Sequence, residues 1–245
     1  MGTKLTTDGL ILRETPVGES DKFVTVLTRD RGVLRASARG ARKVNSRSGV
    51  ATRLLTHAGL SLQESKSGWY IDDARPLHVF FELKNDLEKL ALAQYFCELA
   101  GVVGPREEPA EEALRLLLNA LHYLTEGSRP PLLLKAIVEG RLLAGAGYAP
   151  ALEACSRCGK TEGAFLFLPA EGRLLCADHG GNGLLLSPGA LTGLRHLLEA
   201  PLERCFAFAL PPEDTANLAD AAEAFVLAQL GRGFNTLDFF KTVHS

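Results

Sequence analysis

Four residues with metal-ligating side chains stand as two close pairs in the second half of the chain. Cys155-Ser-Arg-Cys158 is followed, after 17 residues, by Cys176-Ala-Asp-His179, which gives the spacing C-x2-C-x17-C-x2-H. Each pair can supply two ligands from one tight turn, so that three thiolates and one imidazole surround an ion tetrahedrally. Four protein ligands leave no open position for an activated water. The spacing predicts one structural Zn²⁺ ion per chain, bound by Cys155, Cys158, Cys176 and His179.

The alternative for Cys155 and Cys158 is a coincidental pair or a redox pair, which does not require the second ligand pair. The odd number of cysteines, five, argues against a disulfide framework. Cys97 and Cys205 have aromatic and apolar neighbours and are expected in the core.

A second group of residues suits a different chemistry, the binding of phosphates. No acidic residue occurs between Arg31 and Arg53, and the run contains seven cationic side chains. Such like charges repel one another unless a polyanion is present, so we expect a phosphate-binding loop around residues 39–49. The predicted DNA-contacting residues are Arg31, Arg35, Arg39, Arg42, Lys43, Arg47 and Arg53, with Arg195 as a possible extension near the zinc module.

The alternatives are a solvated basic loop and, for Arg195, a solvated helix face. If about four phosphates are neutralised, the affinity for single strands falls with a log-log salt slope of roughly -3. Phe23, Trp69 and Tyr70 are the few aromatic residues nearby. We expect them in the core, and we therefore expect contacts to the backbone of the nucleic acid and not to its bases.

The elements that must position these residues change character along the chain. Five short β-rich runs predict a small barrel, typical of an OB-fold, although the strand count alone leaves an SH3-like barrel open. The runs lie within residues 5–80, at 9–12, 23–27, 33–38, 59–62 and 69–71. Residues 28–32 suit a hairpin turn. The two strands of a zinc ribbon are expected at 164–168 and 173–175.

A helical period replaces the strand pattern from Leu83 onward. Helices are predicted over 83–101, from near Pro109, from 130–131 to the glycines at 145 and 147, over 188–198 and over 218–230. The fold class is therefore α+β, an N-terminal five-stranded OB-fold barrel followed by a helical domain with an inserted zinc-ribbon-like module. The expected parts are 1–80 (nucleic-acid binding), 81–150 (helical bundle), 151–185 (zinc module) and 186–245 (helices packing on the bundle).

The chain of 245 residues has a net charge of -2, but this value averages two unlike parts. Residues 1–80 carry 13 Lys and Arg against 8 Asp and Glu, or +5, and the remainder carries 14 against 21, or -7. A basic segment on an acidic protein indicates a polyanionic partner. Residues Met1-Gly2-Thr3-Lys4 lead into polar residues and not into the apolar region of a signal peptide, and long apolar runs are absent, so we expect a cytoplasmic protein without a membrane partner.

No catalytic constellation is found, and the chain is not expected to be an enzyme. Gly159-Lys160-Thr161 imitates the end of a P-loop, but Ala154 stands where that motif needs glycine. The histidines other than His179 stand apart in sequence, and no residue near them in sequence marks a catalytic base.

Several segments occur in the order found in a known family. Residues 9–13, 17–21, 27–32, 39–43 and 46–47 resemble the N-terminal domain of the bacterial RecO proteins. The match continues through Gly147-Tyr148-Ala-Pro150, Leu186-Ser-Pro188 and Asn235-Thr-Leu-Asp-Phe239. It covers nearly the whole chain. His179 departs from the four cysteines common in the family, although histidine also ligates zinc.

The resemblance implies an OB-fold, a helical domain and a zinc module in a DNA repair and homologous recombination mediator. Such a protein binds single- and double-stranded DNA, anneals complementary strands, and with RecR helps to load RecA onto strands coated by single-strand-binding protein (SSB). The implied protein partners are RecR and the acidic C-terminal tail of SSB, and the implied location is the bacterial nucleoid. Two alternatives remain. One is a scaffold that mainly binds RecR or SSB, and the other is a zinc-dependent hydrolase or nucleotide enzyme.

Overall fold

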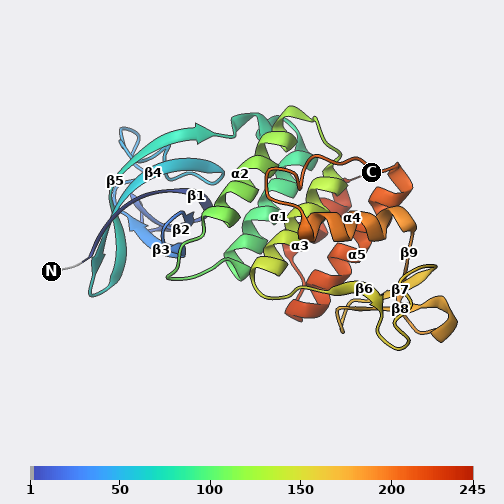
Figure 1. The fold of residues 1–245 in the computed structure, drawn as a ribbon. Coiled ribbons are helices and arrows are strands. Elements are labelled where there is room, and N and C mark those ends of the chain that lie inside the picture. Colours follow the sequence, from blue (N-terminus) through green and yellow to red (C-terminus); the bar gives the residue numbers. More distant parts are fainter. Residues whose placement is uncertain (1–2, 245) are drawn as a thin grey trace. The chain divides into compact units, whose positions relative to one another are not determined.

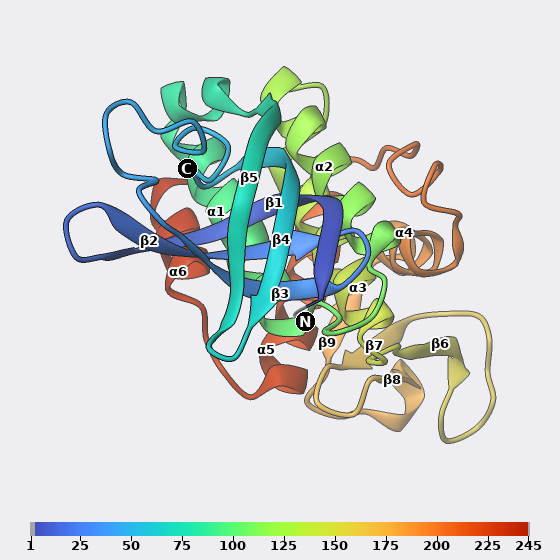
Figure 2. The same ribbon diagram turned by 90° about the vertical axis from the view of Figure 1, so that its left-hand side faces the viewer.

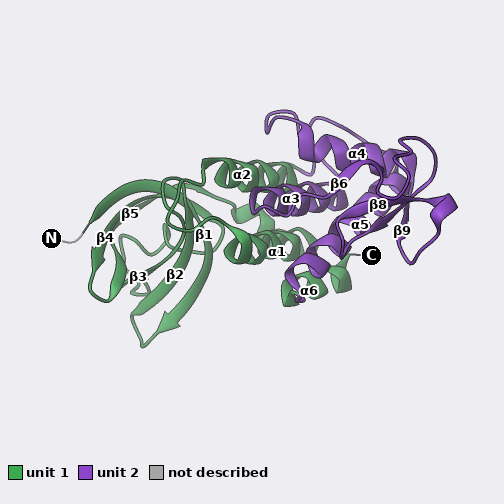
Figure 3. Cartoon of the chain, turned by 60° about the horizontal axis from the view of Figure 1, so that its bottom comes forward, with its two compact units in different colours: residues 1–126, 234–245 green, residues 127–233 purple. Residues whose placement is uncertain are grey.

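The computed structural model describes residues 3–244, and residues 1, 2 and 245, which belong to the first and last of the expected parts, lie outside it. Two compact units are present. One comprises residues 1–126 and 234–245, and the other comprises residues 127–233 (Figure 3). The second unit is thus inserted within the sequence of the first. The four expected parts were defined by residue patterns in the sequence, whereas these two units are defined by packing. The division into four parts therefore stays a prediction.

Five strands close into a barrel in the first unit (Figures 1 and 2). They are β1 (Lys4–Val17), β2 (Asp21–Thr28), β3 (Gly32–Ala38), β4 (Thr56–Ser65) and β5 (Gly68–Val79). All of their pairings are antiparallel except that of β3 with β5. The order is β1-β2-β3-β5-β4, and the short parallel pairing of β3 with β5 completes the barrel. This topology confirms the OB-fold expectation and removes the SH3-like alternative.

Alternation along the strands explains the barrel interior. Val24, Val26, Leu34 and Ala36 are buried in one cluster with apolar residues of β1, β4 and β5, while the intervening residues of β2 and β3 face outward. The predicted turn lies between β2 and β3. Gly32 has a φ of 63° there, and a Cβ would collide with the carbonyl of Pro105, so only glycine fits.

Helices follow the barrel in the same unit. They are η1 (Phe81–Asn85), α1 (Leu87–Val103), α2 (Glu111–Glu126) and, from the end of the chain, α6 (Asn235–Val243). The carboxylate of Asp86 caps α1 by accepting from the N–H of Lys89. The hydroxyl of Thr236 donates to Glu98 at 2.5 Å, which fixes α6 on α1. Helix α6 was not predicted from the sequence.

The second unit combines three helices with a small sheet. The helices are α3 (Pro131–Gly145), α4 (Pro188–Glu199) and α5 (Pro212–Leu230). The sheet has the order β6-β8-β7-β9 and contains β6 (Ala151–Cys155), β7 (Phe165–Leu168), β8 (Arg173–Cys176) and β9 (Leu184–Leu186), with the short helix η2 (Ala177–His179) after β8. We call residues 151–186 the ribbon module. The antiparallel pairing of β7 with β8 confirms the two predicted ribbon strands.

Candidate metal centre and nucleic-acid interface

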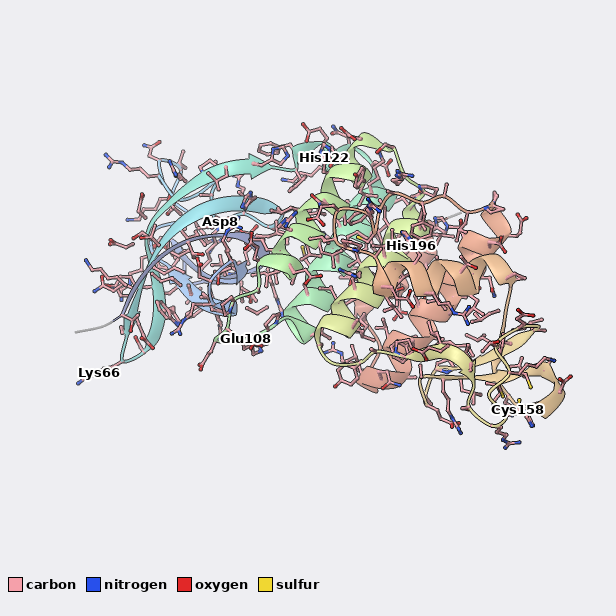
Figure 4. The ribbon with its side chains drawn as sticks, in the orientation of Figure 1. Asp8, Lys66, Glu108, His122, Cys158 and His196 are labelled. Atoms are coloured by element: carbon pink, nitrogen blue, oxygen red, sulfur yellow. The ribbon has the colours of Figure 1, made fainter. Side chains whose placement is uncertain are left out.

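The ribbon module brings the four predicted metal ligands together. Cys155 ends β6, Cys158 lies in the following turn, Cys176 ends β8, and His179 lies in η2. Their potential ligand atoms all lie within 4.8 Å of one another. Figure 4 shows Cys158 on this module. Gly159 permits the tight turn through a φ of 74°, and its N–H donates to the carbonyl of Cys155 at 2.9 Å.

The separations of these atoms fit a tetrahedral ion. Cys158 Sγ lies 3.8 Å from Cys176 Sγ, and His179 Nδ1 lies 3.4 Å from Cys155 Sγ and 3.2 Å from Cys176 Sγ. With Zn–S bonds of about 2.3 Å and Zn–N bonds of about 2.0 Å, tetrahedral geometry requires about 3.8 Å between two sulfurs and about 3.5 Å between sulfur and nitrogen. The cluster can therefore hold a metal ion, with His179 binding through Nδ1.

The electrostatics of the cysteines also favour a cation. Burial opposes ionisation of Cys155, but hydrogen bonds from neighbouring backbone N–H groups and from His179 lower the pKa of its thiol to about 5. Burial and the adjacent Cys155 and Cys158 sulfurs raise the pKa of Cys176. Three sulfurs this close cannot all ionise without a positive charge among them, and a bound metal supplies that charge.

The two remaining cysteines lie outside the cluster, as expected. Cys97 is buried in α1, and burial raises the pKa of its thiol to about 12. Cys205 is fully buried and its thiol donates to the carbonyl of Leu202. Both behave as core residues.

The predicted basic residues occupy the barrel and the loop between β3 and β4. Arg35 lies on the outward face of β3, and Arg31 and Arg39 flank that strand. Arg31 is half-buried, and the other six cations of the run are exposed, namely Arg35, Arg39, Arg42, Lys43, Arg47 and Arg53. Their like charges create a positive potential suited to a polyanion.

Hydrogen-bonded turns shape this loop. The backbone N–H of Arg42 donates to the carbonyl of Ser20 at 3.0 Å, and its guanidinium donates to the carbonyl of Gly18 at 2.6 Å. The carboxylate of Asp21 accepts from the N–H of Gly40 at 2.7 Å, and this hydrogen bond lowers the pKa of Asp21. The start of the loop is thereby tied to the hairpin between β1 and β2.

Three arginines of the run lie over aromatic rings of neighbouring strands. The Cζ atom of Arg35 lies 4.1 Å from the ring centroid of Phe23. The corresponding distances are 5.8 Å from Arg31 to Trp69 and 5.7 Å from Arg39 to Tyr70. These cation–π contacts hold the guanidinium groups at the barrel wall.

The expectation that these three aromatic residues belong to the core is wrong for two of them. Trp69 packs against the barrel core, as expected. Phe23 and Tyr70 are half-exposed instead. Val24 next to Phe23, and Trp69 and Ile71 on either side of Tyr70, pack in or against the core, so strand alternation turns these two rings outward. In the sequence, the alternation of Phe23 with the apolar Val24 is the signal that indicates this outward orientation.

Arg13 is a further cation of this face that the sequence analysis missed. The strand register places Arg13, Thr25 and Arg35 in one row across β1, β2 and β3. Arg13 is exposed and lies outside the acid-free run, so only the pairing of distant segments reveals its position.

Arg195 has other partners. It lies on α4 in the second unit, and its guanidinium donates to the carbonyl of Leu152 at 2.6 and 2.9 Å and to that of Glu153 at 3.3 Å. These bonds hold the start of β6, the strand that ends at Cys155. A contact of Arg195 with DNA stays a prediction.

The barrel also carries a polar groove that the sequence did not reveal. The carboxylate of Asp8 accepts from Arg29 at 2.6 and 3.0 Å, and His57 Nε2 lies 2.7 Å from the same carboxylate. Hydrogen bonding from Arg29, opposed by burial and aided by His57, lowers the pKa of Asp8. These contacts join β1, β4 and the turn after β2. Figure 4 labels Asp8 on the barrel.

Comparison with known families agrees with this arrangement. The family model described as Recombination protein O N terminal matches residues 1–80, and the one described as Recombination protein O C terminal matches residues 84–238. The chain belongs to the RecO family. The resemblance noted in the sequence is thus confirmed, and the chain is a RecO-family DNA repair protein.

Individual relatives cover almost the same length. The DNA repair protein RecO of Symbiobacterium thermophilum is 34% identical to this RecO-family chain, and the match covers 97% of each. That of Acetivibrio thermocellus is 29% identical over 98% of this chain and 97% of the relative. That of Roseiflexus sp. is 34% identical over 97% of this chain and 85% of the relative. Within residues 3–244, none of the helices combines the length and apolar character needed to cross a membrane.

Proposed function

We propose that this RecO-family protein binds single- and double-stranded DNA through phosphate contacts made by the barrel and its β3–β4 loop. The observation that carries the proposal is the run of seven cations from Arg31 to Arg53, six of them exposed, without an acidic residue between them. Neutralising phosphates with such side chains releases counterions, and this release drives association without reading base sequence. Arg13 extends the same face.

The family membership supports a wider role in recombination. We propose that the protein anneals complementary strands and, together with RecR, helps to load RecA onto SSB-coated single strands in the bacterial cytoplasm at the nucleoid. The acidic C-terminal tail of SSB is a further partner. These steps bring macromolecules together and require no bond-making chemistry, so we propose a mediator and not an enzyme.

We propose that the ion held by Cys155, Cys158, Cys176 and His179 is a structural Zn²⁺, one per chain. Three cysteine sulfurs and one imidazole nitrogen are a ligand set that zinc accepts in closed structural sites. When bound, the ion joins the turn after β6 to the end of β8 and to η2. The residues themselves shape two tight turns and donate backbone hydrogen bonds to Cys155.

Charge reversal at two exposed positions tests the DNA proposal. We expect Arg39→Glu/Arg42→Glu to weaken binding of a fluorescent single-stranded oligonucleotide by at least about 10-fold at moderate salt, since two phosphate contacts are lost and repulsion is added. Arg75→Glu is the matched control, because Arg75 is an exposed cation in the polar groove, outside the run. Unchanged affinity in the double variant would sink the assignment of this face.

A second assay separates the mediator from a protein-binding scaffold. RecA assembly on an SSB-coated strand is followed in the presence of RecR, with wild-type protein and with the double charge-reversal variant. We expect the variant to lose most of the stimulation. Full stimulation by a variant that no longer binds DNA would instead favour a scaffold that acts through RecR or SSB alone.

A further inference from the structure

Phe23, Ser37 and Tyr70 form one row across three adjacent strands. Phe23 of β2 pairs with Ser37 of β3, and Ser37 pairs with Tyr70 of β5. Thr15 of β1 and Gln63 of β4 continue the row beyond the two rings. All three central residues lie on the outward face, because their neighbours Val24, Ala36 and Ile71 pack in or against the barrel core. A small polar residue thus separates two outward aromatic side chains.

The spacing of this row leaves room for one planar base. Two strand spacings of about 4.8 Å place the Phe23 and Tyr70 backbones roughly 10 Å apart, with only the serine between them. Side chains in a sheet stand nearly perpendicular to it, and stacking one base between two rings needs ring planes roughly 7 Å apart, twice the 3.4 Å rise of stacked bases. The row is therefore wide enough for one base above Ser37.

Ser37 adds a polar floor without demanding a particular base. Its side chain is half-exposed, and within the described part of the chain its hydroxyl forms no hydrogen bond with another side chain or with the backbone. A hydroxyl both donates and accepts, so it can meet the edge of any base. This tolerance fits a face whose other contacts are to phosphates.

Arginines flank the row on both sides. Arg35 and Arg39 stand two residues before and after Ser37, and they lie over the rings of Phe23 and Tyr70 respectively. A cation–π contact at an exposed site is weaker than the stacking of a base on an aromatic ring. An arriving base can therefore replace the guanidinium on the ring, and the long arginine side chain can turn to the adjacent phosphate.

We propose that Phe23, Ser37 and Tyr70 form a slot for one unpaired nucleobase, with Arg35 and Arg39 on the flanking phosphates. The inference rests on the proposed DNA binding by the same face and adds a contact to bases where the sequence predicted contacts to the backbone alone. A paired base is stacked on both sides within its duplex and enters only after extrusion, which costs unstacking energy. The slot thus favours single strands over duplex.

Three fluorescent probes with equal numbers of phosphates test the slot with the full-length protein: oligothymidylate, a strand of abasic sites, and a duplex. We expect Phe23→Leu and Tyr70→Leu each to weaken oligothymidylate binding by about 10-fold, because base–aromatic stacking is lost. Binding of the abasic strand and of the duplex stays within about 2-fold of wild type. The control Tyr148→Leu removes an exposed aromatic residue of the second unit and leaves all three affinities unchanged.

The outcomes separate the slot from the DNA-binding proposal. Equal losses on oligothymidylate and on the abasic strand, or no loss on either, overturn the slot. If the ring variants bind normally while Arg39→Glu/Arg42→Glu weakens every probe, the slot fails and the phosphate-binding face stands. If neither set of variants changes any affinity, both proposals fail.

A spectroscopic variant guards against a folding defect in the leucine substitutions. The chain has a single tryptophan, Trp69, next to the slot. Trp69→Phe/Tyr70→Trp moves this reporter into the slot itself. Oligothymidylate should quench its fluorescence at saturation, and the abasic strand should not. Equal fluorescence with both probes bound contradicts the inference.

Discussion

The metal cluster and the basic face of the barrel differ in how their charged groups meet a partner. The cluster encloses the place of one ion, whereas the basic face is open to solvent. In the ribbon module, four ligand atoms lie within 4.8 Å of one another and surround the place of a single cation. On the barrel, seven cations are spread over a strand, its flanks and a loop, and six of them are exposed. The first set is closed, so its loss should damage the fold. The second is open toward solvent, so its loss should damage binding and spare the fold.

The largest effect expected from this difference is that of removing a metal ligand. Cys176→Ser should abolish stoichiometric metal binding and the order of the ribbon module, because a structural zinc site contributes on the order of 10 kcal/mol of binding free energy to folding. Metal content by mass spectrometry and hydrogen exchange over residues 151–186 are the measurements. Cys97→Ala, at a buried cysteine outside the cluster, should keep its metal. A Cys176→Ser protein that retains a full metal ion contradicts the assignment.

A buried ion cluster in the second unit provides the next test of the same contrast. Lys135 Nζ lies 3.2 Å from Glu139 and 2.9 Å from Glu223, and Lys135 and Glu139 are almost fully buried. Lys135→Met removes a buried cation that lies beside both carboxylates and should lower the free energy of unfolding by about 3–5 kcal/mol. Urea denaturation measures the loss, and single-strand affinity should not change. Lys135→Met/Glu139→Gln should regain part of the stability, and equal stability of all three proteins would refute this reading.

Neutralising two exposed cations of the basic face should weaken DNA binding and leave stability unchanged, the reverse of the effect expected for Lys135→Met. Arg39→Gln/Arg42→Gln removes two of about four phosphate contacts, so the log-log salt slope for single strands should fall in magnitude from about -3 to about -1.5. The melting temperature should stay close to that of wild type, since neither side chain is buried. Arg75→Gln serves as the control. An unaltered slope would mean that these residues do not contact phosphates.

The smallest predicted effect concerns the polar groove. The pKa of Asp8 is lowered in the folded protein by Arg29, so its contribution to stability is complete above the unfolded pKa of about 3.9 and is lost as the pH falls through the folded value. Asp8→Asn should therefore cost about 1–2 kcal/mol near neutral pH and less at about pH 3, because the contribution of the ion pair declines as the pH falls below the unfolded pKa of Asp8. Urea unfolding at both pH values checks this, with the exposed Asp72→Asn as control. A constant difference across this pH range would contradict the ion pair.

The two regions also differ in how much their sequences predict. The four metal ligands follow from spacing, because each pair needs only one local turn and the hairpin between them is short. The barrel strands were found from their apolar centres, but β1 extends over Lys4–Val17 and β5 over Gly68–Val79, well beyond the predicted runs. Their ends are polar and gain their strand conformation from pairing with distant segments, which no local pattern records.

The same limit explains what was missed. Asp8 and His57 are far apart in sequence and meet because β1 pairs with β4. The row of Phe23, Ser37 and Tyr70 depends on the register of three strands, including a parallel pairing of only two residue pairs. Helix α6 is short and is fixed by Glu98 of α1. Register and nonlocal packing are properties of the fold and not of any window of residues.

A salt titration of single-strand binding, run in parallel with metal analysis, tests the division between the two regions most directly. Wild type, Arg39→Gln/Arg42→Gln and Cys176→Ser are compared. We expect a reduced salt slope with full metal content in the arginine variant, and a wild-type slope with lost metal in the cysteine variant. An arginine variant with an unchanged slope, or a cysteine variant whose slope falls as far as that of the arginine variant, would contradict it.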